Sequence, residues 1–401
     1  MTEREAYIAL NMAQGIGAVT VANGVAALGS AAAFFNAGAA DLARVRGLSR
    51  ESAEGFARAF AVIDWREEIR RADSMRTAIV SFADSAYPSL LKAIHGAPLA
   101  LYVAGRVEAL SMPCAAVVGT RAPTPYGRGN ASGFASAFAR AGFAVVSGLA
   151  RGIDTEAHKA AMSAGGVTVA VVGSALDKLY PAENRELARE IVESGGAVVS
   201  EYPFGRAADK QTFPMRNRII SGLSSGVLVV EAGARSGTMI TASHALEQGR
   251  NVMAIPGRID NDNALGCHKL IKDGARLVDT PEEALDELLS FFPNSRLAAC
   301  PAKAAPYAAL SEPSAHDADA AAPRPSAPLS LPRPAPSAKL DEIESKIVEE
   351  LKNGETTADA LASATALPPH KISSRLTSLE MRLVIERVGP DIIRLRKGRL
   401  M

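Results

Sequence analysis

The sequence GVLVVEAGARSGT, residues 226–238, joins a short apolar run to a loop rich in glycine and hydroxyl residues. The run is nearly all valine and leucine, which is typical of a strand buried on both faces in a parallel sheet. The loop ends in Ser236-Gly237-Thr238, a suitable start for a helix whose backbone N–H groups bind phosphate. This segment therefore predicts an α/β fold with a ligand site at the carboxyl end of a strand.

Further segments repeat this pattern, in which an apolar run is followed by glycine, serine, threonine or arginine. They end in Gly119-Thr120-Arg121, Ser147-Gly148 with Arg151-Gly152, Gly173-Ser174, and Arg216-Asn217-Arg218. Ligands of an open parallel sheet bind outside the carboxyl ends of its strands. We therefore expect these loops to form one extended groove suited to a polyanion.

Between residues 76 and 290, apolar runs alternate with helical stretches of about ten residues, the pattern of a doubly wound sheet. We predict an extended Rossmann-like domain there with a mostly parallel sheet. The expected strands are 77–82, 100–104, 114–118, 143–147, 167–172, 197–200, 226–231, 251–255 and 275–278.

Three other regions flank this domain. Residues 1–72 are alanine-rich and predict a small helical domain, similar to SAM or helix-hairpin-helix domains, in which Gly15-Ile16-Gly17 either is a plain turn or presents N–H groups to phosphate. Residues 291–339 are rich in proline and alanine and predict a disordered linker. Residues 340–401 predict three helices and a β-hairpin, a winged-helix-like domain that binds either nucleic acid or protein. The hairpin strands are expected at 384–387 and 392–395.

The composition limits the class of protein. The 401 residues carry a net charge of +1, with 48% hydrophobic and 22% charged residues, as in ordinary globular proteins. The three cysteines, Cys114, Cys267 and Cys300, form no C-x-x-C pattern, so we expect neither a metal site nor a disulfide framework. No signal peptide or membrane-spanning run is visible, which predicts a cytoplasmic location.

The segment from Lys210 to Arg218 carries the most specific functional signal. Arg216 and Arg218 flank Asn217 at an expected helix start, where the helix dipole favours anions. Phe213 offers a surface on which a base could stack, the combination that single-stranded nucleic acid requires, unless its ring lies in the core. Glu231 is expected to be a counter-ion of Arg216 or Arg218, or a catalytic group.

Asp154 and His158 are four residues apart on an expected helix. Such a pair can share a metal ion, but no third ligand with suitable spacing follows. We therefore interpret Asp154 as the N-cap of the helix and His158 as a packed histidine.

The ordered motifs of residues 119–257 resemble those of the DprA/Smf family of DNA-processing proteins. The matching strings are Gly119-Thr120-Arg121, Ser147-Gly148, Arg151-Gly152-Ile153-Asp154, Ala157-His158, Leu176-Asp177, Tyr180-Pro181, Ser200-Glu201-Tyr202-Pro203, Phe213-Pro214, Arg216-Asn217-Arg218-Ile219-Ile220-Ser221-Gly222, Glu231-Ala232, Ser236-Gly237-Thr238, Thr241-Ala242 and Pro256-Gly257. Two positions depart from the family pattern, since Thr155 and Leu383 stand where glycine is expected.

This resemblance implies a non-enzymatic protein without a cofactor that binds and protects incoming single-stranded DNA irrespective of sequence. It further implies a homodimer that loads a RecA-type recombinase onto that DNA in natural transformation. The dimer contact is expected at His268, Leu270 and Ile271, although this apolar pair could equally be core. The residues expected to bind DNA are Gly119, Thr120, Arg121, Ser147, Gly148, Arg151, Gly152, Lys210, Phe213, Arg216, Asn217, Arg218, Ser236, Gly237 and Thr238.

Two other functions fit parts of the sequence. A Rossmann-like nucleotide phosphoribohydrolase would use Glu231 as a catalytic residue, but Ala242-Ser243-His244 stands where such an enzyme has acidic residues. A regulator of transcription would bind duplex DNA through the winged helix. Release of a free base from AMP would favour the first function, and a preference for duplex DNA would favour the second.

Overall fold

The computed structural model describes residues 1–291, 342–352, 354, 356–365, 376, 379, 385–387 and 392–395. The chain divides into two compact units, Met1–Ala308 and Ala309–Met401, and each is described by itself. The predicted linker, apart from residue 291, and Leu383 and Cys300 lie outside the described residues.

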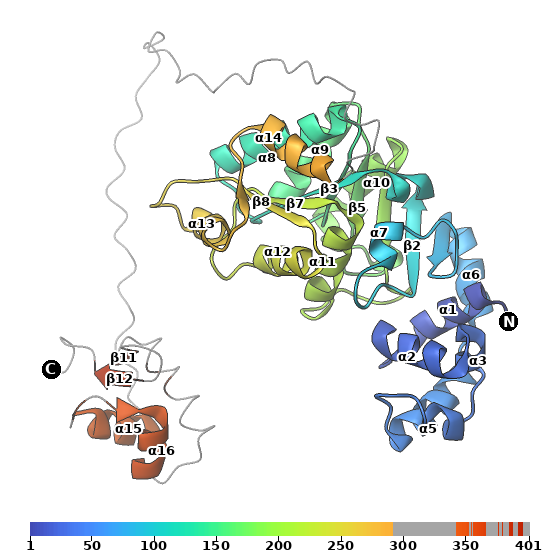
Figure 1. Cartoon of the computed structure of the whole chain (residues 1–401), viewed down its shortest axis with the longest axis horizontal. Coiled ribbons are helices and arrows are strands. Elements are labelled where there is room, and N and C mark those ends of the chain that lie inside the picture. The colour runs from blue at the N-terminus through green and yellow to red at the C-terminus, as the bar shows by residue number, and fades with distance from the viewer. Residues whose placement is uncertain are drawn as a thin grey trace. The chain divides into compact units, whose positions relative to one another are not determined.

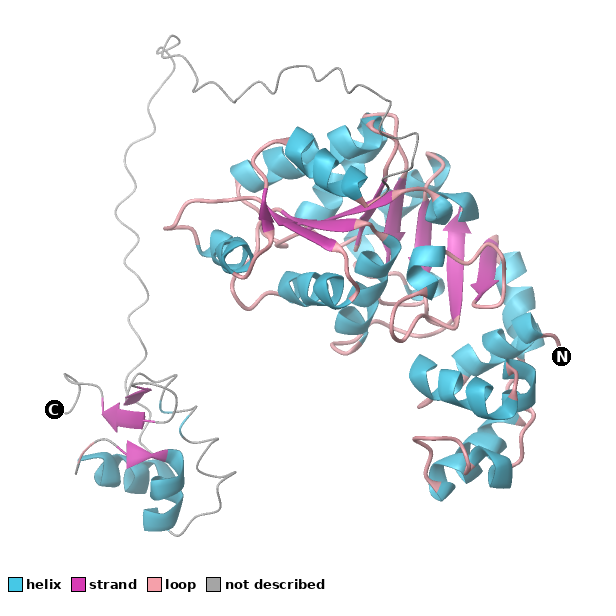
Figure 2. Cartoon of the chain, in the orientation of Figure 1, coloured by secondary structure: helices cyan, strands magenta, loops and turns pink. Residues whose placement is uncertain are grey.

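A nine-stranded sheet forms the centre of the first unit, with the order β1-β2-β6-β5-β4-β3-β7-β8-β9 (Figure 2). The strands from β6 to β9 along this order are parallel, whereas β2 is antiparallel to both β1 and β6. The predicted mostly parallel sheet is therefore confirmed. The strand bounds are β1 Thr77–Ser81, β2 Ala100–Gly105, β3 Cys114–Val118, β4 Ala144–Ser147, β5 Thr168–Val171, β6 Ala197–Ser200, β7 Gly226–Val229, β8 Asn251–Ala254 and β9 Arg276–Leu277.

Helices cover both faces of this sheet (Figure 1). One face packs on α7, α11, α12 and α13, and the other packs on α8, α9 and α14. Phe134 and Phe138 are the large side chains that α8 contributes to this second layer. Helix α10 packs beside β5 and β6 through Leu187 and Ile191. The bounds are α7 Ser89–Lys92, α8 Pro125–Arg140, α9 Ile153–Ser163, α10 Arg185–Glu193, α11 Thr212–Leu223, α12 Gly237–Glu247, α13 Leu265–Lys272 and α14 Pro281–Ser290, with short 3₁₀ turns η1 Val107–Ser111, η2 Leu176–Lys178, η3 Ala182–Asn184 and η4 Asp262–Ala264.

Six helices precede the sheet and pack against its β1–β2 end. Their core contains Phe34, Leu42, Phe60 and Trp65, and Tyr102 of β2 completes it. Gly24 permits the close approach of Phe34, because an added Cβ would lie 2.4 Å from that ring. The bounds are α1 Glu3–Met12, α2 Ala18–Leu28, α3 Ala31–Phe35, α4 Ala39–Leu42, α5 Arg50–Phe60 and α6 Trp65–Ser74.

The described part of the second unit consists of helical segments and a small antiparallel sheet, and Leu376 and Leu379 are helical within the predicted third helix, whose other residues lie outside the described part. Helices α15 (Glu342–Lys352) and α16 (Ala358–Thr365) accompany strands β10 (Thr356–Thr357), β11 (Ile385–Arg387) and β12 (Ile392–Leu395), in the order β10-β12-β11. Ile347, Leu351, Leu361 and Ile393 form its core. Strands β11 and β12 lie within the two predicted hairpin segments.

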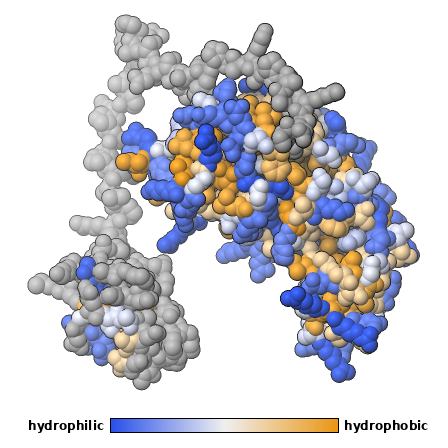
Figure 3. All heavy atoms as spheres, viewed as in Figure 1, coloured by the Kyte–Doolittle hydropathy of each residue, from blue (hydrophilic) through white to orange (hydrophobic). Residues whose placement is uncertain are grey.

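The surface of the described residues mixes hydrophilic side chains with smaller apolar areas (Figure 3). No helix in this described part combines the length and the apolar character that crossing a bilayer requires.

Candidate nucleic-acid interface

The sheet has a topological switch point between β3 and β7. From β3 the chain continues to β4 on one side, and β7 pairs with β3 on the other, so their following loops diverge and leave a crevice. A cavity of about 460 Å³ lies there, and we call it the switch-point cavity. Its lining includes nine of the residues that the sequence predicts to bind DNA: Gly119, Thr120, Arg121, Phe213, Arg216, Asn217, Ser236, Gly237 and Thr238.

A smaller hollow adjoins the switch-point cavity and shares Arg121, Phe213 and Arg216 with it. Its lining adds two more of the predicted residues, Gly148 and Arg151. The loops after β3 and β4 and the start of α11 therefore lie together, as the sequence pattern indicates.

Arg121 and Phe213 form the exposed centre of this surface. The Arg121 guanidinium lies 5.5 Å from the centre of the Phe213 ring. Tyr180 stands on another side, with its ring centre 5.6 Å from that of Phe213. Phe213 is only partly buried, and Arg121 is exposed and has no acidic ion-pair partner among the described residues. The cation thus lies over the aromatic ring at this surface.

Arg216 lines both hollows, but most of its side chain lies in the interior. Its side chain is buried, and Nη1 donates to the carbonyl oxygens of Gly148, at 2.6 Å, and Val171. Burial lowers the pKa of Arg216 to about 10, against the opposing effect of the Asp154 charge. Arg216 therefore ties the ends of β4 and β5 to α11, and its predicted contact with phosphate stays a prediction.

Asp154 is not the N-cap of its helix. The N-cap of α9 is Gly152, with φ of 79°, and Asp154 lies in the first turn. Its carboxylate is buried and accepts hydrogen bonds from the backbone N–H groups of Gly148, at 3.1 Å, and Ala150, at 3.2 Å. Burial raises the pKa of Asp154, while the Arg216 charge lowers it. The carboxylate thus shapes the loop after β4.

His158 is fully buried on α9 and contacts the Thr168 hydroxyl through Nδ1, at 2.7 Å. Burial lowers its pKa to about 3, with a smaller contribution from the Arg216 charge. The ring is therefore neutral at physiological pH. It packs in the core, and the described residues contain no group of three possible metal ligands.

Glu231 is a partner of Thr124 and of neither arginine. Its carboxylate is buried and accepts from the Thr124 backbone N–H at 2.9 Å and from the Thr124 hydroxyl at 2.5 Å. The expectation that it neutralises Arg216 or Arg218 is therefore wrong. Glu231 fixes the start of α8 to the end of β7.

The remaining predicted residues divide between the surface and the interior. Lys210 is exposed, whereas the Ser147 side chain is fully buried and donates to the Val117 carbonyl at 2.6 Å. Gly152 allows two loops to meet, because an added Cβ would lie 2.4 Å from the Thr120 carbonyl oxygen. Arg218 is ion-paired with Glu201, and both side chains are 11% exposed. Ser147 and Arg218 are therefore not free to grip DNA in this structure.

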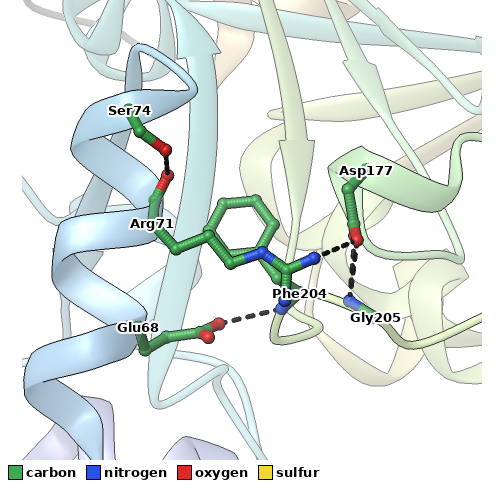
Figure 4. Close-up of polar contacts among 6 residues, drawn as sticks. All are labelled: Glu68, Arg71, Ser74, Asp177, Phe204 and Gly205. Carbon is green, nitrogen blue, oxygen red and sulfur yellow. Dashed lines mark hydrogen bonds and ion pairs between the residues drawn. The ribbon is translucent and has the colours of Figure 1, made fainter.

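The loop at residues 203–206 is anchored by helix α6 (Figure 4). The Glu68 carboxylate accepts from the Phe204 backbone N–H at 2.8 Å, and Arg71 donates to Asp177 at 2.7 Å. Asp177 also accepts from the Gly205 backbone N–H at 2.9 Å. Sequence reasoning missed this connection because it joins elements far apart in the chain.

The residues predicted to form a dimer contact are engaged within the chain. Leu270 of α13 is buried in the core, and Ile271 packs against the same cluster. His268 Nε2 lies 2.9 Å from the Gly257 carbonyl oxygen. Of the two alternatives that the sequence left open, the structure supports core packing for Leu270.

Both units match known protein families. Residues 78–289 match the model described as DNA recombination-mediator protein A, and residues 331–389 match the DprA winged helix domain. Protein Smf of Escherichia coli (strain K12) is 40% identical over 315 residues, which cover 78% of this chain and 76% of that protein. DNA processing protein DprA of Streptococcus pneumoniae (strain ATCC BAA-255 / R6) is 44% identical over 207 residues, covering 52% of this chain and 73% of that protein.

A solved structure has the same architecture. The X-ray structure of DNA processing protein A from Streptococcus pneumoniae superposes with a TM-score of 0.63 and 35% sequence identity. The superposition covers 72% of this chain and 98% of that one.

Proposed function

The chain belongs to the DNA recombination-mediator protein A family, also called DprA/Smf, and from that premise we propose that it binds single-stranded DNA at the switch-point cavity. The name of the Streptococcus pneumoniae relative describes DNA processing, and we extend that function to this chain. The observation that carries the proposal is the pairing of Arg121 with the partly exposed ring of Phe213, 5.5 Å away.

This pair supplies the two interactions that single strands require. A guanidinium holds a phosphate, and an aromatic face stacks against an unpaired base. The neighbouring loops add backbone N–H groups at the start of α12, whose N-cap Ser236 makes no capping hydrogen bond through its side chain. None of these groups reads the edge of a base, so we propose binding that is independent of sequence.

We further propose that the bound strand is protected and passed to a RecA-type recombinase during natural transformation, and that the protein acts as a cytoplasmic homodimer. The contact between copies would lie near α13, with Leu270 supporting it from the core and not meeting the partner. The buried free thiols of Cys114 and Cys267 suit a reducing compartment.

A binding role fits better than nucleotide hydrolysis. The Glu231 side chain is 2% exposed, is held by Thr124 and is absent from the lining of the switch-point cavity. A catalytic carboxylate must reach its substrate. The candidate residue for hydrolysis therefore serves as a structural link.

Fluorescence anisotropy of a labelled oligothymidylate tests the proposal. Arg121→Ala should weaken binding about tenfold or more, because a charge-assisted phosphate contact is lost. The matched control is Arg140→Ala, an exposed arginine in the last turn of α8, which should bind as the wild type does. Equal affinities for the two variants would contradict a DNA site at the switch point.

A further inference from the structure

A second cavity, of about 490 Å³, lies on the other side of the start of α11. The turn between α1 and α2, which contains Gly15-Ile16-Gly17, forms one wall, and we call this space the hairpin cavity. The loop at residues 201–206 forms another wall, and α6 anchors that loop (Figure 4). The space is therefore built jointly by the N-terminal helices and the α/β domain.

The start of α11 is a wall shared by both cavities. Phe213 and Arg216 face the switch-point cavity, whereas Met215 and Arg218 line the hairpin cavity. A strand held at Phe213 would therefore reach the hairpin cavity by passing the start of α11.

The charges of the hairpin cavity are already balanced. Arg218 is paired with Glu201, and Arg206 is paired with Asp209 at 2.5 Å. A phosphate gains little from arginines whose charge a carboxylate already neutralises. The hairpin cavity therefore differs in kind from the switch-point cavity, where Arg121 has no acidic partner among the described residues.

Its other surfaces suit a neutral, flat and polar group. Met215 is 51% exposed, and a thioether packs well on an aromatic ring. Tyr202 and Ile16 add apolar surface, while Gln14 and Gln211 supply amide donors and acceptors. One guanidinium nitrogen of Arg218, Nη1, is buried and has no hydrogen-bond partner among the described residues, so an acceptor would satisfy it.

We propose that the hairpin cavity holds an unpaired nucleobase of the same DNA strand whose phosphates bind at Arg121. This inference rests on the proposed function and extends it by giving the N-terminal helices a place on the DNA path. The switch-point cavity holds the backbone by charge. The hairpin cavity holds a base by stacking and hydrogen bonding.

Filling the cavity tests the proposal. Gly17→Trp places a large side chain in its wall, where an added Cβ has open space and the φ of −96° is allowed for any residue. The matched control is Gly38→Trp, since Gly38 is also a helix N-cap with open space, a φ of −73° and no side-chain capping bond. Both are measured as full-length proteins.

The probes are labelled oligothymidylates with one abasic position that is moved along the strand. An abasic position removes the base and keeps the phosphate, so it separates the two kinds of contact. Wild type and Gly38→Trp should lose about tenfold in affinity at one or two positions, the size expected for one stacked base. Gly17→Trp should bind the intact probe about tenfold more weakly and be insensitive to those positions.

Several outcomes would overturn the proposal. If Gly17→Trp binds the intact probe as tightly as wild type does, no base occupies the hairpin cavity. The same conclusion follows if the two proteins lose affinity at the same abasic positions. If Gly17→Trp does not fold, Met215→Ala replaces it, and its unchanged affinity would have the same meaning. Absence of wild-type binding, or indifference to Arg121→Ala, would instead contradict the proposed function itself.

Discussion

Thr124 donates two hydrogen bonds to Glu231, through its backbone N–H at 2.9 Å and its hydroxyl at 2.5 Å, although 107 residues separate them in the chain. The bonds join Thr124, the N-cap of α8, to Glu231, which lies two residues beyond the end of β7. These two residues follow β3 and β7, so this link ties together the two chain segments that leave the switch point.

Glu231→Ala should therefore lower the free energy of unfolding by about 2 kcal/mol, because it leaves two partly buried donors without a charged acceptor. Urea unfolding followed by circular dichroism measures the loss. Glu190→Ala, at an exposed position of α10, is the control and should change stability little. Equal losses in both variants would show that the link is not structural.

Arg121→Ala should also change the salt dependence of DNA binding. Each phosphate contact on a single strand contributes about 0.7 to the slope of log K against log salt concentration. The variant should therefore show a slope about 0.7 shallower than wild type, while Arg140→Ala keeps the wild-type slope. Weaker binding with an unchanged slope would mean that Arg121 acts by supporting the Phe213 ring instead of contacting phosphate.

His158 makes the stability of the protein dependent on pH. Burial lowers its pKa to about 3 in the folded chain, whereas an unfolded histidine titrates near 6.5. As the pH falls from 6.5 towards 3, only the unfolded state takes up the proton, so stability present above pH 6.5 is lost at about 1.4 kcal/mol per pH unit.

His158→Gln should remove this component of the pH dependence, which urea titrations at a series of pH values would reveal as a shallower slope below pH 6.5. His95→Gln changes an exposed histidine and is the control that should retain the wild-type slope. If stability falls with pH equally steeply in wild type and in His158→Gln, His158 is not the source of this pH dependence.

Gly152 and Gly165 separate the effect of backbone conformation from that of a close approach. Both have positive φ, of 79° and 75°, but an added Cβ would lie 2.4 Å from the Thr120 carbonyl oxygen at Gly152 and would meet open space at Gly165. Gly165→Ala should cost about 1 kcal/mol of stability, the conformational penalty alone. Gly152→Ala should cost more and should also weaken DNA binding, because the loops after β3 and β4 must move apart. Similar melting temperatures for the two variants would argue against this close contact.

The strands could be predicted from the sequence because their signal is local. Runs such as Val227 to Val230 have the composition of buried parallel strands, and each expected strand lies within two residues of the one observed. It could also be predicted that the loops of the switch-point cavity lie close together, since parallel strands place their carboxyl ends on one edge of the sheet.

The partners of the buried charges could not be predicted in the same way. Arg216 donates to a carbonyl group 68 residues away, and Glu231 accepts from a residue 107 positions away. An arginine in a glycine-rich motif gives the same sequence pattern whether its side chain is exposed to solvent or is buried and hydrogen-bonded to a loop. The difference depends on burial, which only the assembled sheet determines.

The anchoring of the 203–206 loop by Glu68 and Arg71 matters for anyone who shortens this protein. A fragment that begins at β1 keeps every strand and still lacks two of the side chains that hold the loop in place. Such a fragment would be smaller, and the wall that this loop gives to the hairpin cavity would also be altered. A minimal functional version of this protein should therefore begin before α6.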